Sequence, residues 1–252
     1  MNKKIALVSA GLLIGILTLI LLASSGTGES PVSFDAEAKE IKEAKRFVPG
    51  LPENVDSKIE PECNLELLHV FYGADKKIVG RLAGYSLAFI SCNEFNVNLQ
   101  YEEKKGVGFQ VDLTDVRSLE KYLHKESPGG EKHAKFSAGL AQEYCVIAEA
   151  DISARAELRK SGLMDMDAEE KKNPSPGIYD VAGSKICHSA GVCKEDGSCD
   201  GIMALSTFGG GRYSLEISTR DNPAASGTTQ NAEAFFKQVT GAFSFEKLQA
   251  TQ

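Results

Sequence analysis

An uncharged, apolar run near the start of the chain constrains the rest of the sequence more than any other feature. Ile5 to Ala23 consists mainly of Ile, Leu, Val, Ala and Gly, and its nineteen residues present no polar face. As a helix, such a run rises about 28 Å, close to the thickness of the hydrocarbon core of a bilayer. A helix also satisfies its own backbone hydrogen bonds in lipid. The sequence therefore predicts a membrane-inserted segment.

The charges around this run predict its orientation. Lys3 and Lys4 precede it, and the first charged residues after it are Glu29, Asp35 and Glu37. Positive charge is retained on the cytoplasmic side of a membrane helix. We therefore expect a single-pass protein of the cell membrane, with a C-terminal domain that is periplasmic or extracellular.

Two interpretations of the run remain open. Ala23 and Ser25 are small residues at positions −3 and −1 of a cleavage site before Gly26, which would make the run a signal peptide and the protein secreted. The run is, however, longer than the 7–15 residues usual for the apolar part of a signal peptide, which favours an uncleaved anchor.

The next segment reads as a tether and a stalk. Residues 26–33 are rich in Gly, Ser, Thr and Pro, and Phe34 to Phe47 is a charged, Ala-rich stretch that predicts a helix with a thin apolar stripe. The predicted organisation is a signal anchor or signal peptide at 1–25, a tether and charged stalk helix at 26–60, and an extracytoplasmic α+β domain at 61–252.

The charge of the chain limits its partners. Without Lys3 and Lys4, 26 Lys and Arg stand against 35 Asp and Glu, a net charge of −9. Nucleic acids and anionic lipid surfaces both require clustered basic residues. We therefore expect no nucleic-acid partner, contact with the membrane through the N-terminal helix, and a protein partner in the envelope.

Six cysteines follow the apolar run, and an even number in an exported domain predicts disulfides. Six cysteines allow fifteen sets of three pairs, and the sequence does not choose among them. The last three are spaced C-x5-C-x5-C in a loop-like segment, and at least one of them is expected to bond to an earlier cysteine. The candidates are Cys63, Cys92, Cys145, Cys187, Cys193 and Cys199.

Metal and redox chemistry are weaker interpretations of the same residues. A metal site would use Cys187, His188, Cys193 and Cys199, but zinc sites usually contain C-x2-4-C pairs. No C-x-x-C motif of a redox enzyme is present. We predict no metal and no cofactor.

The first half of the outer domain contains strand signals and one helix signal. Apolar and polar residues alternate in Phe95–Tyr101 and again in Val107–Leu113, which predicts a hairpin with one apolar face. Val116, Leu119 and Leu123 lie on one side of a short predicted helix. Two further strands are predicted at Leu65–Tyr72 and Lys77–Ser91.

The end of the chain repeats this order. Strands are predicted at Ile202–Phe208 and Tyr213–Ser218, joined by a turn at Gly209–Gly211, and a helix follows with Ala232, Phe235, Phe236 and Val239 at helical spacing. Ala83–Gly84–Tyr85–Ser86 and Ala182–Gly183–Ser184 also share a fragment. An internal duplication of hairpin-helix units is one explanation, and the frequency of this motif is the other.

The middle of the domain is ambiguous between strand and helix. Even positions from Ala134 to Leu158 are mostly apolar, whereas the alanines and the set Ile147, Ala150, Ala154 and Leu158 favour a helix. We predict a strand at Glu143–Glu149, a helix at Ile152–Ser161, and a loop at 164–177.

One catalytic motif is nearly present. Gly84–Ala88 resembles the G-x-S-x-G turn that carries a serine nucleophile, here Ser86. That turn must follow a buried strand and open a helix, but the preceding residues include Gly80 and Arg81 and the following ones read as strand. The four histidines share no motif spacing. We therefore predict no catalytic residue.

These observations predict an α+β domain: an antiparallel sheet with two or three helices packed on one face, cross-linked by disulfides behind an N-terminal transmembrane helix. The expected function is that of a membrane-anchored, extracytoplasmic binding module, such as an accessory subunit of an envelope complex. It would bind through a sheet edge or through the loops at 164–201. The alternatives are an exported hydrolytic enzyme and a metal-handling protein that uses the Cys187–Cys199 segment.

Overall fold

The computed structural model describes residues 48–104, 107–126, 131–162, 165–190, 201–220 and 229–249; for 104, 131–138 and 220 it describes the backbone alone. All of these residues belong to one compact unit, Ile41–Gln252. The predicted membrane segment and most of the predicted tether and stalk lie outside the described residues. Within them, no helix combines the length and the apolar character that crossing a bilayer requires.

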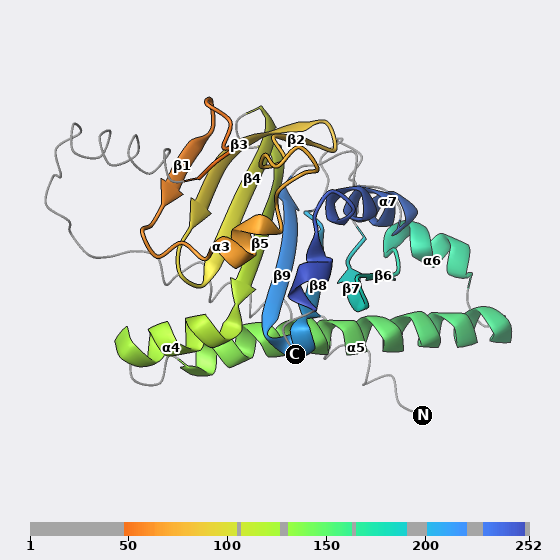
Figure 1. The fold of residues 1–252 in the computed structure, drawn as a ribbon. Helices are drawn as coiled ribbons and strands as arrows, with labels where there is room; N and C mark the ends of the chain where they lie inside the picture. Colours follow the sequence, from red (N-terminus) through yellow and green to blue (C-terminus); the bar gives the residue numbers. More distant parts are fainter. Residues whose placement is uncertain are drawn as a thin grey trace, which may run out of the picture. The chain divides into compact units, whose positions relative to one another are not determined.

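The described residues form a mixed α+β fold around one nine-stranded sheet (Figure 1). The strands follow the order β1-β3-β4-β5-β9-β8-β7-β6, and β2 pairs with β3. β1 runs parallel to β3, and the other pairs are antiparallel. The strands are β1 Asp56–Ile59, β2 Arg81–Leu82, β3 Tyr85–Cys92, β4 Asn96–Lys104, β5 Val107–Asp115, β6 Gly177–Val181, β7 Ser184–His188, β8 Met203–Phe208 and β9 Tyr213–Arg220.

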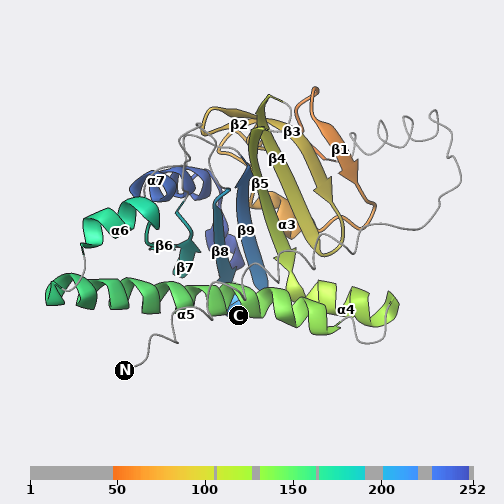
Figure 2. The same cartoon turned by 180° about the vertical axis from the view of Figure 1, so that it is seen from behind.

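Five α-helices and two short 3-10 helices accompany the sheet in the described residues (Figure 2). The predicted helix after β5 is confirmed as α4, and the predicted helix near the end of the chain is confirmed as α7. The helices are α3 Leu65–His69, α4 Val116–Glu126, α5 Glu131–Ser161, α6 Met166–Lys172, α7 Thr229–Thr240, η1 Gly209–Gly211 and η3 Phe245–Leu248.

Alternation along the central strands produces the core. In β5, Phe109, Val111 and Leu113 are buried, while Gln110 and Asp112 between them are only partly buried. Successive side chains of a strand point to opposite faces, so one face of the sheet is apolar and the other polar. Both predicted hairpins, β4–β5 and β8–β9, are confirmed, and β5 pairs with β9 at the centre of the sheet.

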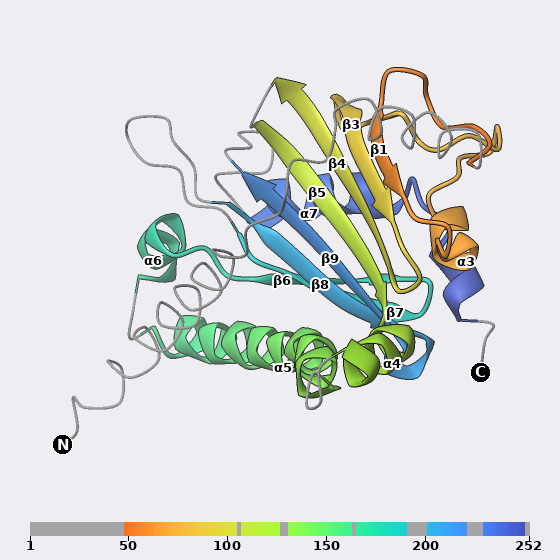
Figure 3. The same ribbon diagram turned by 90° about the vertical axis from the view of Figure 1, so that its left-hand side faces the viewer.

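The prediction that the helices pack on one face is wrong, because α5 and α7 lie on opposite faces (Figure 3). On the core side, the Phe235 ring of α7 meets the Phe109 ring of β5 at 5.2 Å between centroids. On the other side, Cys145 of α5 is bonded to Cys187 of β7. β7 and β8 are buried on both faces, as the successive buried residues Ile186 and Cys187 of β7 and Ala204 and Leu205 of β8 show, so they require a layer on each side.

The predicted strand at Glu143–Glu149 is also wrong, because α5 runs without interruption from Glu131 to Ser161. The residues at strand spacing and those at helical spacing are both apolar here, so spacing alone does not separate the two structures. The length of the segment and its alanines do, because 31 residues are too many for an ordinary strand and alanine favours a helix. The helix buries Ala141 and Ala148 against the sheet. Its other side carries a second set of apolar residues, described below.

The predicted strand at Leu65–Tyr72 begins instead with helix α3. The side chain of Asn64 accepts hydrogen bonds from the backbone N–H groups of Glu66 and Leu67, which is the geometry of an N-cap. Leu67 and Leu68 are buried beneath the sheet's apolar face. In the same way, Asp165 caps α6 within the segment predicted to be a loop.

The fragment shared by 83–86 and 182–184 marks two equivalent hairpin turns. Ala83 and Gly84 join β2 to β3 with φ of 52° and 90°, and Ala182 and Gly183 join β6 to β7 with φ of 48° and 76°. Two successive positive φ angles are typical of the type I′ turn, which fits the twist of a hairpin. Turn geometry therefore accounts for the similarity. The strand order β3-β4-β5 recurs as β7-β8-β9 on the other side of the sheet centre, as a duplication would also produce.

The folded part begins before Pro61. Val48 and Val55 are buried in the main core, and β1 pairs with β3. These residues fall in the stretch 26–60 that the sequence assigns to the tether and stalk.

Candidate functional site

Two disulfides are present among the described residues, Cys63–Cys92 and Cys145–Cys187. Cys187 lies in strand β7 rather than in a loop, and it bonds to a cysteine 42 residues earlier. This agrees with the expectation that one of the last three cysteines reaches back along the chain. Cys193 and Cys199 lie outside the described residues.

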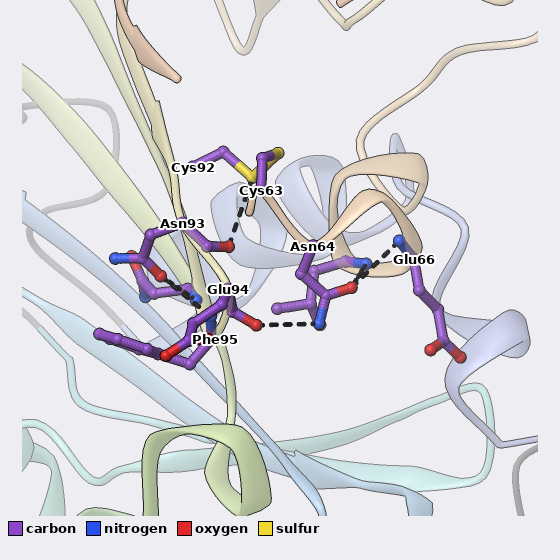
Figure 4. Close-up of a disulfide and its surroundings, with 9 residues drawn as sticks. Cys63, Asn64, Glu66, Cys92, Asn93, Glu94 and Phe95 are labelled. Carbon is purple, nitrogen blue, oxygen red and sulfur yellow. Dashed lines mark hydrogen bonds between the residues drawn. A yellow bond between two sulfur atoms is a disulfide. The ribbon is translucent and has the colours of Figure 1, made fainter. Parts of the chain in front are cut away.

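The Cys63–Cys92 bond joins the start of α3 to the turn between β3 and β4 (Figure 4). The Asn64 side chain donates a hydrogen bond to the Glu94 carbonyl at 3.4 Å. The Asn93 side chain accepts from the backbone N–H groups of Phe95 and Asn96. These hydrogen bonds form a rigid corner around the disulfide, and the Asn side chains are engaged in holding it.

Cys187, the first ligand of the metal site considered for the Cys187–Cys199 segment, is bonded to Cys145 in a disulfide. A thiolate, not a disulfide sulfur, ligates zinc. Among the described residues, no group of three or more His, Cys, Asp or Glu is arranged to hold a metal ion.

The structure does not bring Ser86 together with His188. Ser86 is an exposed residue of β3, in a regular pairing with Arg81 and Glu102, so the strand interpretation of this segment is confirmed. His188 lies in β7, five strand spacings away in the sheet order. At about 4.8 Å per spacing, the two residues are about 24 Å apart, beyond any proton transfer between them.

His188 occupies a closed, mostly aromatic environment between the sheet and α7. Its ring is fully buried, and Nδ1 lies 2.9 Å from the Ser189 carbonyl. The ring centroids of Tyr179 and Phe236 lie 6.1 Å and 5.4 Å from that of His188. Nε2 has no hydrogen-bond partner among the described residues and lies 4.0 Å from the Glu233 carboxylate. That carboxylate is also paired with Lys237 of the same helix at 2.6 Å.

This environment lowers the pKa of His188 below its usual 6.5, chiefly because burial disfavours the charged ring. The Ser189 carbonyl and Glu233 oppose the shift, and Lys237 adds to it. Gly177 leaves room for the ring, since a Cβ there would lie 2.1 Å from Nε2. His188 is therefore a core residue kept neutral by its surroundings.

We expect this histidine to make folding pH-dependent. The pKa of His188 is lower in the folded chain than in the unfolded chain. At a pH between these two pKa values, the unfolded chain therefore binds one proton more at this residue. The free energy of unfolding is then unaffected above the unfolded pKa and falls as pH drops below about 6.5, by at most about 1.4 kcal/mol per pH unit. Urea unfolding at pH 7.5 and at pH 5.0 measures this loss of stability. His188→Gln should remove the loss, whereas His69→Gln, at an exposed histidine, should leave it unchanged. Equal losses in all three proteins would contradict the assignment.

The outward side of α5 carries the two most exposed large apolar side chains among those described in this helix. Val146 is 65% exposed and Ile147 is 57% exposed. Ala150 and Ala154 continue the same side at spacings of four residues, and they are also exposed. We call these four residues, Val146, Ile147, Ala150 and Ala154, the outer stripe.

The outer stripe sits on a fixed support and has an acidic rim. Cys145, next to Val146, is bonded to β7, and Glu149 forms an ion pair with Lys185 of the same strand. Glu143 and Glu157 are exposed toward the two ends of the stripe. A cavity of about 240 Å³ opens between the helix and the sheet here, lined by Ala141, Gln142, Cys145, Val146, Glu149, Lys185 and Thr207.

The helical pattern of this surface is visible in the sequence, but it predicts a buried face rather than an exposed one. Ile147, Ala150 and Ala154 correctly predict a helix, but apolar residues at this spacing usually form the side of a helix that packs on the core. The structure uses Ala141 and Ala148 for that purpose. The helix thus has two apolar sides, and only one of them is covered by the described residues.

The face of the central sheet opposite the apolar core is polar. Asn96, Asn98 and Gln100 of β4 stand beside Thr114, Asp112 and Gln110 of β5 in register. Several of these side chains bond to each other, such as Asn96 to Thr114 at 3.0 Å. A shallow cavity of about 350 Å³ lies on this face and is lined by Gln100, Tyr101, Glu102, Gly108, Phe109, Gln110 and Ser218.

Together, these features define a disulfide-cross-linked α+β domain with an exposed apolar helix surface and no assembled catalytic group among the described residues. Comparisons of the chain with protein-family models, with curated proteins and with solved structures find no match.

Proposed function

We propose that the chain is a membrane-tethered, extracytoplasmic binding module, and that the outer stripe of α5 binds a basic, amphipathic helix of a partner protein. The observation that carries the proposal is the exposure of Val146 and Ile147, side by side on a helix that is already fixed to the sheet by its other face. A helix with apolar residues on both sides is normally covered on both.

The exposed side chains contribute free energy to a contact. Full burial of a fully exposed Val or Ile contributes about 1.5–3 kcal/mol, so Val146 at 65% exposure and Ile147 at 57% together offer about 2–4 kcal/mol before the cost of association. Ala150 and Ala154 are small, so a partner helix can approach closely along the same line. Because α5 is held at Cys145, little order is lost on binding.

Charge favours a basic partner over a second copy of this chain. A symmetric antiparallel pair of α5 helices centred on Ala150 would place Glu143 opposite Glu157 and Glu149 opposite Asp151. Glu157, Glu149 and Asp151 are each paired with a cation of their own chain, so it is chiefly the net charge of −7 on each copy that disfavours a second copy. A helix with Lys or Arg beside its apolar stripe would instead meet the acidic rim with complementary charge.

The apolar N-terminal run and the disulfides both support the proposed location of the module. The apolar run at 5–23 and the acidic residues after it support an anchor and an exported domain. Disulfides persist in oxidising compartments, and two are present in the described residues. Recovery of the intact chain from the cytosol, with Cys63, Cys92, Cys145 and Cys187 reduced, would contradict this part of the proposal.

A photo-crosslinking residue placed at Val146 of the full chain, in native membranes, tests the docking surface. We expect one specific adduct from position 146 and none from position 65, where Leu65 is also exposed, at 54%, on another element. The cross-linked protein is then identified and purified for binding measurements.

The purified partner should bind the full chain with an affinity that depends on the outer stripe. We expect the double variant Val146→Asp, Ile147→Asp to weaken binding at least about 100-fold, since it removes the apolar contact and adds repulsion. Leu65→Asp, the matched control, should leave the affinity unchanged, and added salt should weaken binding by the native chain. Equal affinities of the two variants, or partner binding that is strengthened by salt, would overturn the proposal.

A further inference from the structure

We propose that a second site, on a different part of the domain, binds a small phosphomonoester. A cavity of about 480 Å³ lies where the first described residues, the end of α3, the following turn and the C-terminal segment meet. We call it the cationic pocket. It is lined by Pro49, His69, Tyr72, Gly73, Ala74, Lys76, Ser244 and Lys247.

The charge of the pocket is opposite to that of the chain. Lys76 and Lys247 line it, and no Asp or Glu does, although acidic residues outnumber basic ones, 35 to 28, in the whole sequence. The two acidic residues next to these lysines in sequence, Asp75 and Glu246, do not line the pocket, and Asp75 uses its carboxylate to accept the backbone N–H of Lys77. The pocket is therefore a positively charged recess in an acidic protein, which attracts an anion.

Two lysines and a serine of the pocket have no side-chain partner in the described part of the chain. Neither Lys76 nor Lys247 forms an ion pair there, in contrast to Lys160, Lys185 and Lys237. The Ser244 backbone N–H is bonded to the Val70 carbonyl, while its hydroxyl has no protein partner in that part. Two ammonium groups and a hydroxyl offer more donors than one carboxylate can use, and they suit the three outer oxygens of a phosphate group.

The remaining wall suits a flat, apolar substituent on that phosphate. The rings of His69 and Tyr72 lie 5.3 Å apart, edge to face, and Pro49 and Ala74 complete the lining. The Tyr72 hydroxyl donates to the Pro49 carbonyl at 2.7 Å, which holds the ring at the wall. A phosphate that carries a ring or a short apolar group therefore fits better than free phosphate.

Isothermal titration calorimetry on the full chain in mild detergent tests this site with phenyl phosphate, inorganic phosphate and phenol. We expect phenyl phosphate to bind with a Kd of about 1 mM or tighter, inorganic phosphate more weakly, and phenol not at all. Lys76→Gln and Lys247→Gln should each weaken phenyl phosphate binding about tenfold, because each removes one charge-assisted contact.

Lys77→Gln is the matched control, since Lys77 is exposed beside Lys76 but does not line the pocket. A water-soluble dihexanoyl phosphatidate serves as the probe for a lipid source: binding at least about tenfold tighter than phenyl phosphate assigns the pocket to lipid headgroups, and otherwise to soluble phosphomonoesters. Absence of saturable binding of both probes up to about 20 mM would overturn the proposal, as would an equal effect of Lys77→Gln and the two pocket variants. The partner-binding assay at the outer stripe should not respond to either pocket variant, so the two proposals fail separately.

Discussion

Replacing Cys145 and Cys187 together by alanine should lower the free energy of unfolding of the full chain by about 4 kcal/mol. The bond closes a loop of 42 residues, and a cross-link of this span restricts the unfolded chain strongly. Removing both sulfurs avoids a new free thiol. Urea unfolding of the native chain and the double variant, in the same detergent, measures the difference.

The Cys63→Ala, Cys92→Ala variant is the control for position, because its loop of 29 residues predicts a similar loss of about 3.6 kcal/mol. The two variants should differ in amide hydrogen exchange. Loss of Cys145–Cys187 should speed exchange in the middle of α5, whereas loss of Cys63–Cys92 should leave α5 protected. Unchanged exchange in α5, or a stability loss below about 1 kcal/mol, would show that packing alone holds this helix on the sheet.

Phe236→Ala should cost about 3–5 kcal/mol of stability, the second large effect. Phe236 is 0% exposed, and its ring lies 5.4 Å from the rings of both Phe235 and His188. Truncation leaves a cavity between α7 and the sheet that rigid strands cannot fill. Thermal or urea unfolding gives the loss.

Leu65→Ala is the comparison for Phe236→Ala, because it also removes a large apolar side chain but from an exposed position. It should change stability by less than about 0.5 kcal/mol. A small loss in Phe236→Ala, comparable to that of the control, would mean that α7 does not form the core of the domain.

Elements with a single apolar face were predictable from the sequence. The β4–β5 hairpin, β9 and α7 each have one buried and one more exposed side, so their periodicity identifies them. α5 failed this test because both of its sides are apolar. α3 failed because it has only five residues, and a short apolar run does not distinguish a helix from a strand.

The arrangement of the elements was less predictable than their type. A strand that is buried on both faces, such as β7, shows no alternation, so the sequence did not reveal that helices cover both sides of the sheet. The pairing of Cys145 with Cys187 was not predictable for the same reason, since the two residues meet only because α5 packs on β7. The outer stripe was detected as a helical pattern, but its exposure depends on which side of α5 meets the sheet. The cationic pocket joins residues from 49 to 247, and no local signal could have assembled it.

The bond between Cys145 and Cys187 determines how mechanical tension would pass through the domain. A pull on Val146 acts on the residue next to a covalent cross-link, so the force reaches β7 at once, without sliding of α5 over the sheet. From β7 it spreads along backbone hydrogen bonds to β6 and β8. Reduction of this single bond would remove the direct covalent path from α5 to β7 while leaving the strands of the sheet paired.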